Sequence, residues 1–398
     1  MINNENNLDL KTKNKIYLDY QASTPVDPEV LKAMNPYFCD IYGNPHSSEH
    51  SFGWKANDAI EVAKEYISRY INCLDTEIYF TSGATESNNL AITGTVLAAL
   101  TKNINRKTIL VSSIEHKCVL GAARFVQRFG FKVQKLPVTS DGIVDLQVLE
   151  NLLKNNDVLL TAIMATNNEI GVNQPLNIIG DLCEKYGSNF HVDAAQGAYS
   201  NIDVVENKIS TMSLSGHKVY GPKGIGCLLI RDNLSLKPEP IIYGGGQQNG
   251  FRSGTMPVEL IVGMGEAFNI LIKNKDIEIE RVSKLRNKLL MKLQSKIDIK
   301  VNGTLKSRHP GNLNICLLKG DSKNLILSLQ PNLAFSTGSA CTSGIIEPSH
   351  VLKALGLSNE ECDRSFRITV GRFTTEDDID NTVELITDKY EKMLEIGE

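Results

Sequence analysis

Residues 213–224 read Ser-Leu-Ser-Gly-His-Lys-Val-Tyr-Gly-Pro-Lys-Gly. They overlap the end of a segment with alternating apolar residues, 209–214, that is typical of a buried strand. The glycines and the proline predict a tight turn after this strand and no regular element. Lys218 lies in the turn, where an unpaired ammonium would cost several kcal/mol of desolvation. A Schiff base with a carbonyl cofactor removes that cost; the alternative is a loop lysine that binds backbone carbonyls. Lys223 follows in the same loop, but a proline and a glycine flank it, so Lys218 is the better candidate.

A carboxylate, Asp193, ends a second short apolar strand that begins at Phe190. Open α/β sheets bind their ligands at the carboxyl ends of strands. An aspartate at this edge, followed by Lys218 at the end of the next strand, suits pyridoxal phosphate. The carboxylate would keep the ring nitrogen protonated, so that the ring acts as an electron sink. A helix-capping aspartate is the alternative, and it does not account for the lysine.

The composition limits the class of protein. With 398 residues the chain is long enough for two domains with substantial cores, and 41% hydrophobic and 22% charged residues are ordinary for a soluble globular protein. The net charge of −4 gives no polycationic surface, so we expect no direct nucleic-acid partner. No apolar run is long enough to span a membrane, and residues 1–15 lack the apolar core of a secretory signal. We therefore expect a cytoplasmic protein.

Eight cysteines are scattered along the chain without a Cys-x-x-Cys pair, which argues against a zinc site and favours reduced thiols. Cys341 differs from the others because its surroundings, residues 336–344, are almost wholly small: Ser-Thr-Gly-Ser-Ala-Cys-Thr-Ser-Gly. Such a segment has nothing to pack into a core. It predicts a reactive thiol on a mobile loop, the alternative being a flexible linker that happens to hold a cysteine.

Strands alternate with helices between residues 78 and 232, which predicts a mostly parallel sheet with helices on both faces. The turn at 81–88, Thr-Ser-Gly-Ala-Thr-Glu-Ser-Asn, is either an anion site at a helix N-terminus or a simple capping box. His116 and Asn168 also fall at strand ends, although His116 taken singly is typical of a helix cap. Helices are expected over 29–38, 146–155 and 176–186, and the last helix is expected to begin with Thr374 or Thr375 as its cap. A helix is also expected from Glu259 to about Lys296, long enough to reach a second domain.

Five short motifs resemble those of one known family, in the family's order. They are 81–86 (Thr-Ser-Gly-Ala-Thr-Glu), 215–218 (Ser-Gly-His-Lys), 221–224 (Gly-Pro-Lys-Gly), 252–255 (Arg-Ser-Gly-Thr) and 338–341 (Gly-Ser-Ala-Cys). The chain resembles the cysteine desulfurases of the NifS/IscS type, within the class V, fold-type-I pyridoxal phosphate enzymes. The likeness runs from Tyr17 to Thr375, nearly the whole chain.

The resemblance implies an α/β fold with a mostly parallel seven-stranded sheet, helices on both faces and a smaller α+β domain. The implied domains are a large cofactor-binding domain at 16–262 and a small domain at 263–398 that carries the cysteine loop. The N-terminal segment, 1–26, would pack on the small domain.

The resemblance also implies roles for individual residues. Lys218 would carry pyridoxal phosphate and Asp193 would pair with its ring nitrogen, while Gln196 and Asn168 would lie at its phenolic oxygen. The phosphate would be held by Ala84, Thr85, Ser215 and His217, and by Thr255 of the other subunit, which makes the site dimeric. His116 would stack on the ring and move protons, Arg367 would bind the substrate carboxylate, and Cys341 would accept the sulfur.

The implied activity is a sulfurtransferase that converts L-cysteine to L-alanine and leaves a persulfide on Cys341 for an acceptor or scaffold protein. A selenocysteine lyase, a related aminotransferase and an inactive binding platform are the rivals; an aminotransferase has no need of Cys341. Family members with a scaffold-docking tail serve iron–sulfur cluster assembly, and the residues up to Glu398 do not resemble that tail. Iron–sulfur assembly, thiolation of tRNA and thiolation of DNA therefore all stay open. No resident metal is expected, apart from transient binding of an iron–sulfur cluster by Cys341.

Overall fold

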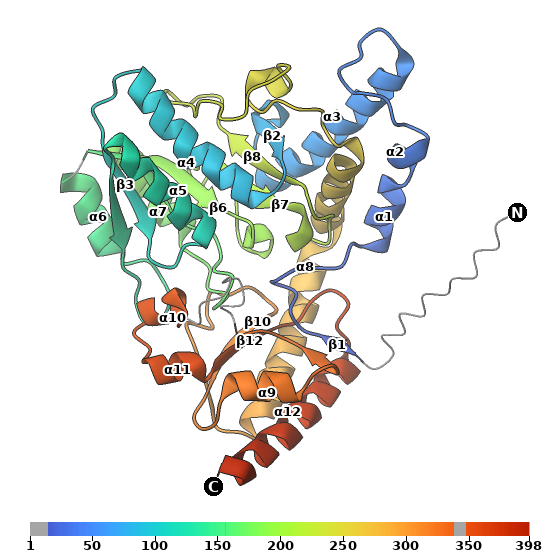
Figure 1. The fold of residues 1–398 in the computed structure, drawn as a ribbon, viewed down its shortest axis with the longest axis vertical. Helices are drawn as coiled ribbons and strands as arrows, with labels where there is room; N and C mark the ends of the chain where they lie inside the picture. Colours follow the sequence, from blue (N-terminus) through green and yellow to red (C-terminus); the bar gives the residue numbers. More distant parts are fainter. Residues whose placement is uncertain (1–14, 156, 338–347, 398) are drawn as a thin grey trace, which may run out of the picture.

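The computed structural model describes residues 15–155, 157–337 and 348–397 (Figure 1). The upper part of the molecule is built around a seven-stranded sheet with the order β2-β8-β7-β6-β5-β3-β4. Its strands are β2 (Ile78–Thr81), β3 (Thr108–Ser112), β4 (Lys132–Leu136), β5 (Val158–Ala162), β6 (Asn189–Asp193), β7 (Thr211–Ser215) and β8 (Gly226–Ile230). Only β8 runs antiparallel to its neighbours, β2 and β7. The predicted mostly parallel sheet is therefore confirmed.

Helices cover both faces of this sheet because successive residues of a strand point to opposite sides. Ile109 and Val111 of β3 belong to one core cluster, with residues of α4 and α5, whereas Leu110 between them belongs to another, with residues of α3, α6 and α7. The helices of this part are α1 (Pro28–Met34), α2 (Pro36–Cys39), α3 (Ser51–Ile71), α4 (Ala84–Thr101), α5 (Lys117–Val126), α6 (Leu146–Asn155) and α7 (Leu176–Tyr186). Single 3-10 turns lie at Asp75–Glu77, Gln127–Phe129, Gly197–Tyr199, Gly216–Lys218 and Gln248–Gly250.

A second, smaller unit lies below the first in Figure 1 and has its own core. Its three-stranded antiparallel sheet has the order β12-β10-β9, formed by Ser365–Thr369, Asn312–Leu317 and Ile299–Val301. The helices around it are α9 (Ser322–Ser328), α10 (His350–Ala354), α11 (Asn359–Asp363) and α12 (Glu376–Gly397). The N-terminal strand β1 (Ile16–Tyr17) pairs with β11 (Leu333–Ala334) of this unit.

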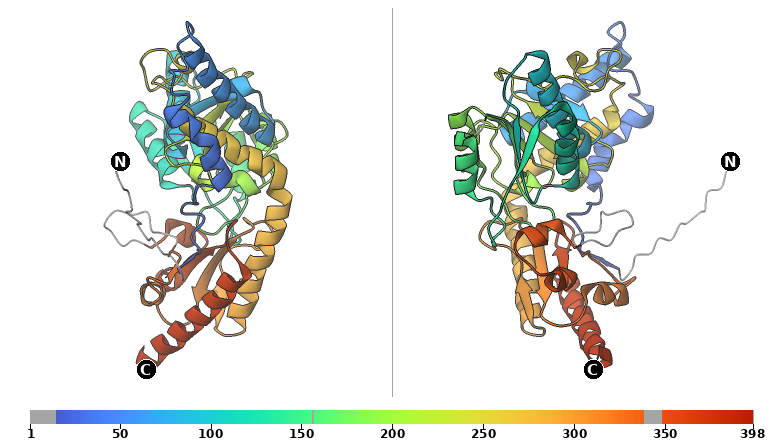
Figure 2. Two further views of the ribbon diagram at one scale, coloured as in Figure 1. Left: turned by 90° about the vertical axis from the view of Figure 1, so that its right-hand side faces the viewer. Right: turned by 60° about the vertical axis from the view of Figure 1, so that its left-hand side comes forward.

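One helix, α8 (Val258–Gln294), runs through both units and is 37 residues long (Figure 2). Phe268 in its first half belongs to the core of the larger unit, and Leu289 in its second half to that of the smaller unit. Near its middle, Glu278 accepts a hydrogen bond from Arg372 Nη2 at 2.9 Å. Arg372 also binds Asp27 at 2.8 Å and lies 4.1 Å from the centre of the Tyr220 ring. These contacts join both units at Arg372, whose side chain is 12% exposed.

Two local predictions are wrong. The helix expected over 29–38 is divided into α1 and α2, because Pro36 has no backbone N–H to continue the first helix. The turn after β7, expected to be irregular, contains one 3-10 turn at Gly216–Lys218. The predicted cap of the last helix is confirmed at Thr375, whose hydroxyl accepts from the N–H of Asp378 at 3.1 Å.

Within the described ranges no helix is both long enough and apolar enough to cross a lipid bilayer. The same residues contain no group of three or more histidine, cysteine, aspartate or glutamate side chains placed to hold a metal ion.

Candidate active site

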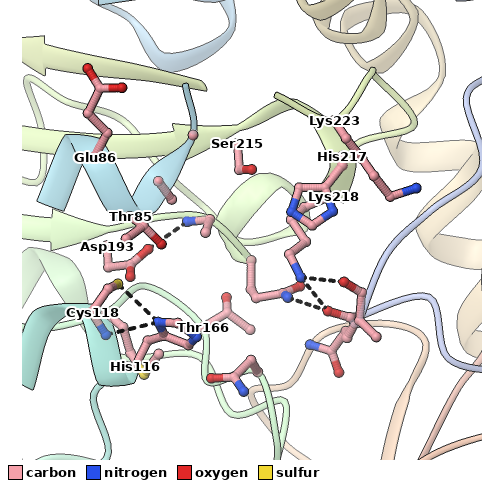
Figure 3. Close-up of a pocket in the computed structure, with 18 of the residues that line it drawn as sticks. Thr85, Glu86, His116, Cys118, Thr166, Asp193, Ser215, His217, Lys218 and Lys223 are labelled. Atoms are coloured by element: carbon pink, nitrogen blue, oxygen red, sulfur yellow. Dashed lines mark hydrogen bonds between the residues drawn. The ribbon is translucent and has the colours of Figure 1, made fainter. Parts of the chain in front are cut away.

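A cavity of about 500 Å³ lies where the carboxyl ends of the parallel strands meet the smaller unit (Figure 3). The structure brings together at this cavity ten of the twelve predicted site residues. They are Ala84, Thr85, His116, Asn168, Asp193, Gln196, Ser215, His217, Lys218 and Arg367. Side chains up to about 280 positions apart in the sequence thus line one space.

Lys218 reaches the cavity from the 3-10 turn after β7. Its Nζ donates to the backbone carbonyls of Gln21 at 2.8 Å and Ala22 at 2.7 Å. In this structure the amine binds backbone carbonyls, as the alternative had it, and the Schiff base of Lys218 with a carbonyl cofactor stays a prediction. Sequence reasoning missed both partners because a backbone carbonyl has no residue signature. The two contacts hold the amine at the cavity wall, where a carbonyl ligand would meet it.

Asp193 ends β6 and is 5% exposed. Its Oδ1 accepts from the N–H of Ala195 at 3.0 Å, and its Oδ2 from Nδ2 of Asn88 at 2.8 Å. Burial raises the pKa of Asp193, and these donors, with His116 and Lys218, only partly offset the rise. A cationic N–H at the cavity would stabilise this carboxylate, because an opposite charge favours the ionised form.

The N-terminus of α4 opens on the same cavity. Its N-cap residue, Gly83, has no side chain to cap the helix and has a φ of 149°, which only glycine adopts readily. A Cβ at this position would meet no atom within 4 Å, so there is room beside it. Glu86 in the first turn accepts from the N–H of Ser82 at 2.8 Å and from Arg252 at 2.7 Å. Only the glutamate half of the predicted capping box is thus present, no side chain among the described residues caps the N-terminal N–H groups of α4, and Ala84 and Thr85 line the cavity.

His217 lies beside this helix end. Its Nδ1 is 3.2 Å from the hydroxyl of Ser23, and burial, followed by Lys218 and Lys223, lowers its pKa to about 4. The imidazole is therefore neutral at physiological pH and offers one N–H donor. Gln196 donates from Nε2 to the carbonyl of Gln21 at 2.8 Å, which fixes its side chain in the cavity wall.

His116 is both a helix cap and a cavity residue. Its Nδ1 accepts from the N–H of Cys118 at 3.2 Å, as the cap of α5, and lies 3.0 Å from the Sγ of the same residue. Burial lowers the pKa of His116 and raises the pKa of the Cys118 thiol to about 12. Sequence analysis missed Cys118, although its place two residues after His116 in a helix-start pattern was the available signal.

Arg367 lies in β12 and is 4% exposed. Its Nη1 donates to the carbonyl of Asn168 at 2.7 Å and its Nη2 to Asp19 at 2.5 Å. Among the described residues, Nε of this guanidinium has no hydrogen-bond partner. An unpaired buried donor is costly, so an anionic ligand at this end of the cavity would stabilise it. Asp19 is a further residue that sequence reasoning did not find.

The two remaining predicted residues are not at the cavity. Thr255 is exposed and does not line the cavity of its own chain. Cys341 lies outside the described residues. The flanking residues on both sides are described: Ser336 pairs through its backbone with Arg367, and the Ser349 hydroxyl donates to Glu169 at 2.5 Å. Both flanking segments are therefore attached close to the cavity: Ser336 pairs with the cavity residue Arg367, and Ser349 binds Glu169, which follows the cavity residue Asn168.

These groups fit pyridoxal phosphate. An uncapped helix N-terminus suits its phosphate, a buried carboxylate suits its ring nitrogen, and a lysine amine suits its aldehyde. The cavity volume is also in the range of small-molecule sites. The fold and the site define a pyridoxal phosphate enzyme of fold type I.

Comparison with known proteins narrows this class. The aminotransferase class-V family model matches residues 16–382. Cysteine desulfurase IscS of Rickettsia bellii (strain OSU 85-389) is 47% identical over 384 residues, covering 96% of this chain and 92% of the relative. The IscS of Rickettsia prowazekii (strain Madrid E) is 46% identical over 95% of this chain and 92% of its own.

Solved structures of similar proteins indicate the same family as these sequence relatives. A NifS-like protein superimposes with a TM-score of 0.87 at 32% identity, covering 95% of this chain and 99% of its own. A structure described as SspA in complex with cysteine has a TM-score of 0.80 at 37% identity, covering 91% and 100%. The chain belongs to the class-V aminotransferase family and, within it, to the cysteine desulfurases of the NifS/IscS type.

Proposed function

We propose that this protein converts L-cysteine to L-alanine and transfers the sulfur to Cys341, from which an acceptor protein takes it. The main support for this proposal is the environment of the Arg367 side chain. Its buried guanidinium has an unpaired Nε within the described chain and lines the cavity, and its backbone forms a bridge with Ser336, which precedes Cys341 in the sequence. An amino-acid carboxylate suits this guanidinium, because its planar fork binds carboxylates in two-point fashion.

Bound pyridoxal phosphate supplies an electron sink for the negative charge that develops at the substrate Cα. The residues of this chain supply the rest. Asp193 would hold the ring nitrogen, Gln196 and Asn168 would bind the phenolic oxygen, and the phosphate would be held by Ala84, Thr85, Ser215 and His217. The Lys218 amine would hold the cofactor and would act as the general base that removes the Cα proton.

His116 acts at the substrate sulfur and carbon. Its Nδ1 already accepts an N–H from Cys118, so the proton of the neutral ring resides on Nε2. We infer that His116 meets the substrate as a proton donor and that protonation of the departing carbon is its main task. A role for His116 as the base that deprotonates the incoming thiol has less support, because its acceptor nitrogen, Nδ1, is already occupied by the N–H of Cys118.

Cys341 completes the reaction. Its thiolate attacks the sulfur of L-cysteine, forming an S–S bond as the C–S bond breaks, and the carbon takes up a proton to give alanine. The products are L-alanine and a Cys341 persulfide, so sulfur, protons and electrons balance without another reactant. The persulfide then serves iron–sulfur assembly, tRNA thiolation or DNA thiolation through an acceptor protein.

We place this reaction in the cytoplasm. The seven cysteines within the described ranges are all free thiols, which supports a reducing compartment.

The carboxylate role of Arg367 gives the functional test. The holoenzyme is expected to release equimolar alanine and sulfide from L-cysteine with a thiol reductant present. Arg367→Lys keeps the charge but loses the planar fork, so the KM for L-cysteine should rise roughly tenfold or more. Steady-state alanine assays measure both. Arg364→Lys, a matched change outside the cavity, should behave as the wild type; formation of a keto acid in place of alanine would favour the aminotransferase rival.

We also propose that the enzyme is a homodimer in which Thr255 reaches the phosphate of the partner. Large aromatic side chains are exposed around α2 and the start of α3, namely Phe38, Tyr42, Phe52 and Trp54. Exposed apolar groups of this size are typical of a protein interface. A second copy that covers them would remove this surface from water.

Mixed subunits test the dimer. Each site would use Lys218 of one chain and Thr255 of the other, so a Lys218→Ala subunit paired with a Thr255→Ala subunit has one intact site. Random pairing should then give about a quarter of the wild-type activity, above that of either variant alone. Lys218→Ala mixed with Asp193→Ala is the control, because no pairing restores a site when both residues serve their own chain. Sedimentation of a fully active monomer would contradict the proposal.

A further inference from the structure

A continuous hydrogen-bond chain leads away from Asp193 into the protein interior. Nδ2 of Asn88 donates to Asp193 at 2.8 Å, and Oδ1 of Asn88 lies 2.8 Å from Nε2 of His191. Nδ1 of His191 lies 2.9 Å from the hydroxyl of Thr211. None of these three partners was identified from the sequence. No step of the proposed reaction uses them directly, so their arrangement needs an explanation of its own.

The fold produces this alignment from three neighbouring elements. His191 and Asp193 are two apart in β6, so both point to the face of the sheet that α4 covers. Thr211 is the register partner of His191 in β7, and Asn88 lies in the first half of α4. Asn88 and His191 have no exposed surface, and Thr211 is 2% exposed. Water is therefore not available to replace a lost partner.

Chemistry allows only one direction of donation when Asp193 is ionised. A carboxylate only accepts, so Asn88 must present its amide nitrogen to Asp193 and its oxygen to His191. His191 must then carry its proton on Nε2, and the hydroxyl of Thr211 must donate to Nδ1. Burial lowers the pKa of His191 to about 3, so the ring is neutral and carries a single proton. Reversing the chain would place the Asn88 oxygen against Asp193 and require a protonated Asp193.

We propose that Thr211, His191 and Asn88 are positioning residues whose one-directional hydrogen-bond chain holds Asp193 as a carboxylate against the cofactor's ring nitrogen. Together with the N–H of Ala195, the chain gives each carboxylate oxygen a donor. The inference rests on the proposed role of Asp193.

Asn88 also connects this chain to His116. The second N–H of its amide lies 3.2 Å from Sγ of Cys118, which contacts Nδ1 of His116. A single buried amide thus fixes the orientation of the carboxylate and supports the helix start that holds the cavity histidine. Loss of the amide should therefore change the protonation of the cofactor ring more than it changes the affinity for the substrate.

The test is the protonation of the ring nitrogen, measured by NMR on holoenzyme loaded with pyridoxal phosphate labelled with 15N in the ring. The wild type should show a protonated nitrogen at pH 8. Asn88→Leu removes a hydrogen bond to a charged group, so ring protonation should fall and cofactor affinity should weaken roughly ten- to hundredfold. His191→Phe should act in the same direction. His191→Gln, whose amide places a donor near the former Nε2, should restore much of both readouts.

Matched threonines provide the control. Thr211→Val should lower ring protonation and cofactor affinity measurably. Thr161→Val removes an equally buried hydroxyl in β5, which is bonded to the Ser188 hydroxyl at 2.9 Å, and should change neither readout. Unchanged ring protonation and affinity in a folded Asn88→Leu, or no difference between His191→Phe and His191→Gln, would overturn the inference. Asp193→Asn distinguishes a failure of the hydrogen-bond chain from a failure of the role proposed for Asp193. If this variant also leaves the ring nitrogen protonated, the assignment of Asp193 itself is wrong.

Discussion

Lys218→Ala should reduce alanine formation from L-cysteine by about 10⁴-fold or more, because one amine both carries the cofactor and takes the Cα proton. The fold should persist, since Lys218 lies in a surface-accessible turn at the cavity wall, where its amine binds the carbonyls of Gln21 and Ala22. Borohydride reduction of the wild-type holoenzyme should fix the cofactor to the peptide that contains Lys218. The variant should show no such adduct. Peptide mass spectrometry and alanine assays measure these outcomes.

Lys223→Ala is the matched control for this experiment. Lys223 is exposed at the rim, and Figure 3 shows its amine directed away from Asp193. The control should keep nearly full activity and the adduct on Lys218. An active Lys218→Ala, or an adduct that maps to Lys223, would show that the wrong lysine has been chosen.

Cys341→Ala should lower alanine formation about 10³-fold or more, since it removes the nucleophile that accepts the sulfur. L-Cysteine should still bind and still change the absorption spectrum of the cofactor, because Arg367 and the cofactor residues are intact. After one turnover of the wild type, mass spectrometry should find about 32 Da of added sulfur on the Cys341 peptide. The variant should show no such addition.

Other thiols supply the controls. Cys118 is the only cysteine among the described residues that lines the cavity, and burial raises its pKa to about 12. Less than a thousandth of it is therefore thiolate near pH 7.5, so it is a poor nucleophile. Cys118→Ala and Cys39→Ala, the latter at an exposed position in α2, should stay within about threefold of the wild type. Sulfur that maps to Cys118 would contradict the assignment of Cys341.

The position of a residue could be predicted from the sequence where a physical rule relates the sequence pattern to a place in the fold. Parallel strands bring their carboxyl ends to one edge, so Asp193 and Lys218 could be predicted to meet, and they line one cavity. Helical periodicity also predicted α6 and α7 with the bounds that the structure has. The break between α1 and α2 was predictable in principle, because Pro36 stood in the sequence.

Other parts of the site had no such rule. The acceptors for Lys218 are backbone carbonyls nearly 200 residues earlier, which no side-chain pattern reveals. Asn88 sits inside α4, where a polar residue is usually on the solvent side, and only tertiary packing shows that it faces β6. Asp19 was also not predicted, because its ion pair with Arg367 depends on how distant segments of the chain meet in the fold.

The uninterrupted course of α8 has a consequence for motion. About 55 Å of continuous helix crosses the boundary between the units, so they are not joined there by a loop that could swivel. Opening one unit against the other would require the helix to bend and the Arg372 contacts with Glu278 and Asp27 to stretch. We therefore expect small-amplitude bending in place of domain closure, and an active-site geometry that is already set before the substrate arrives.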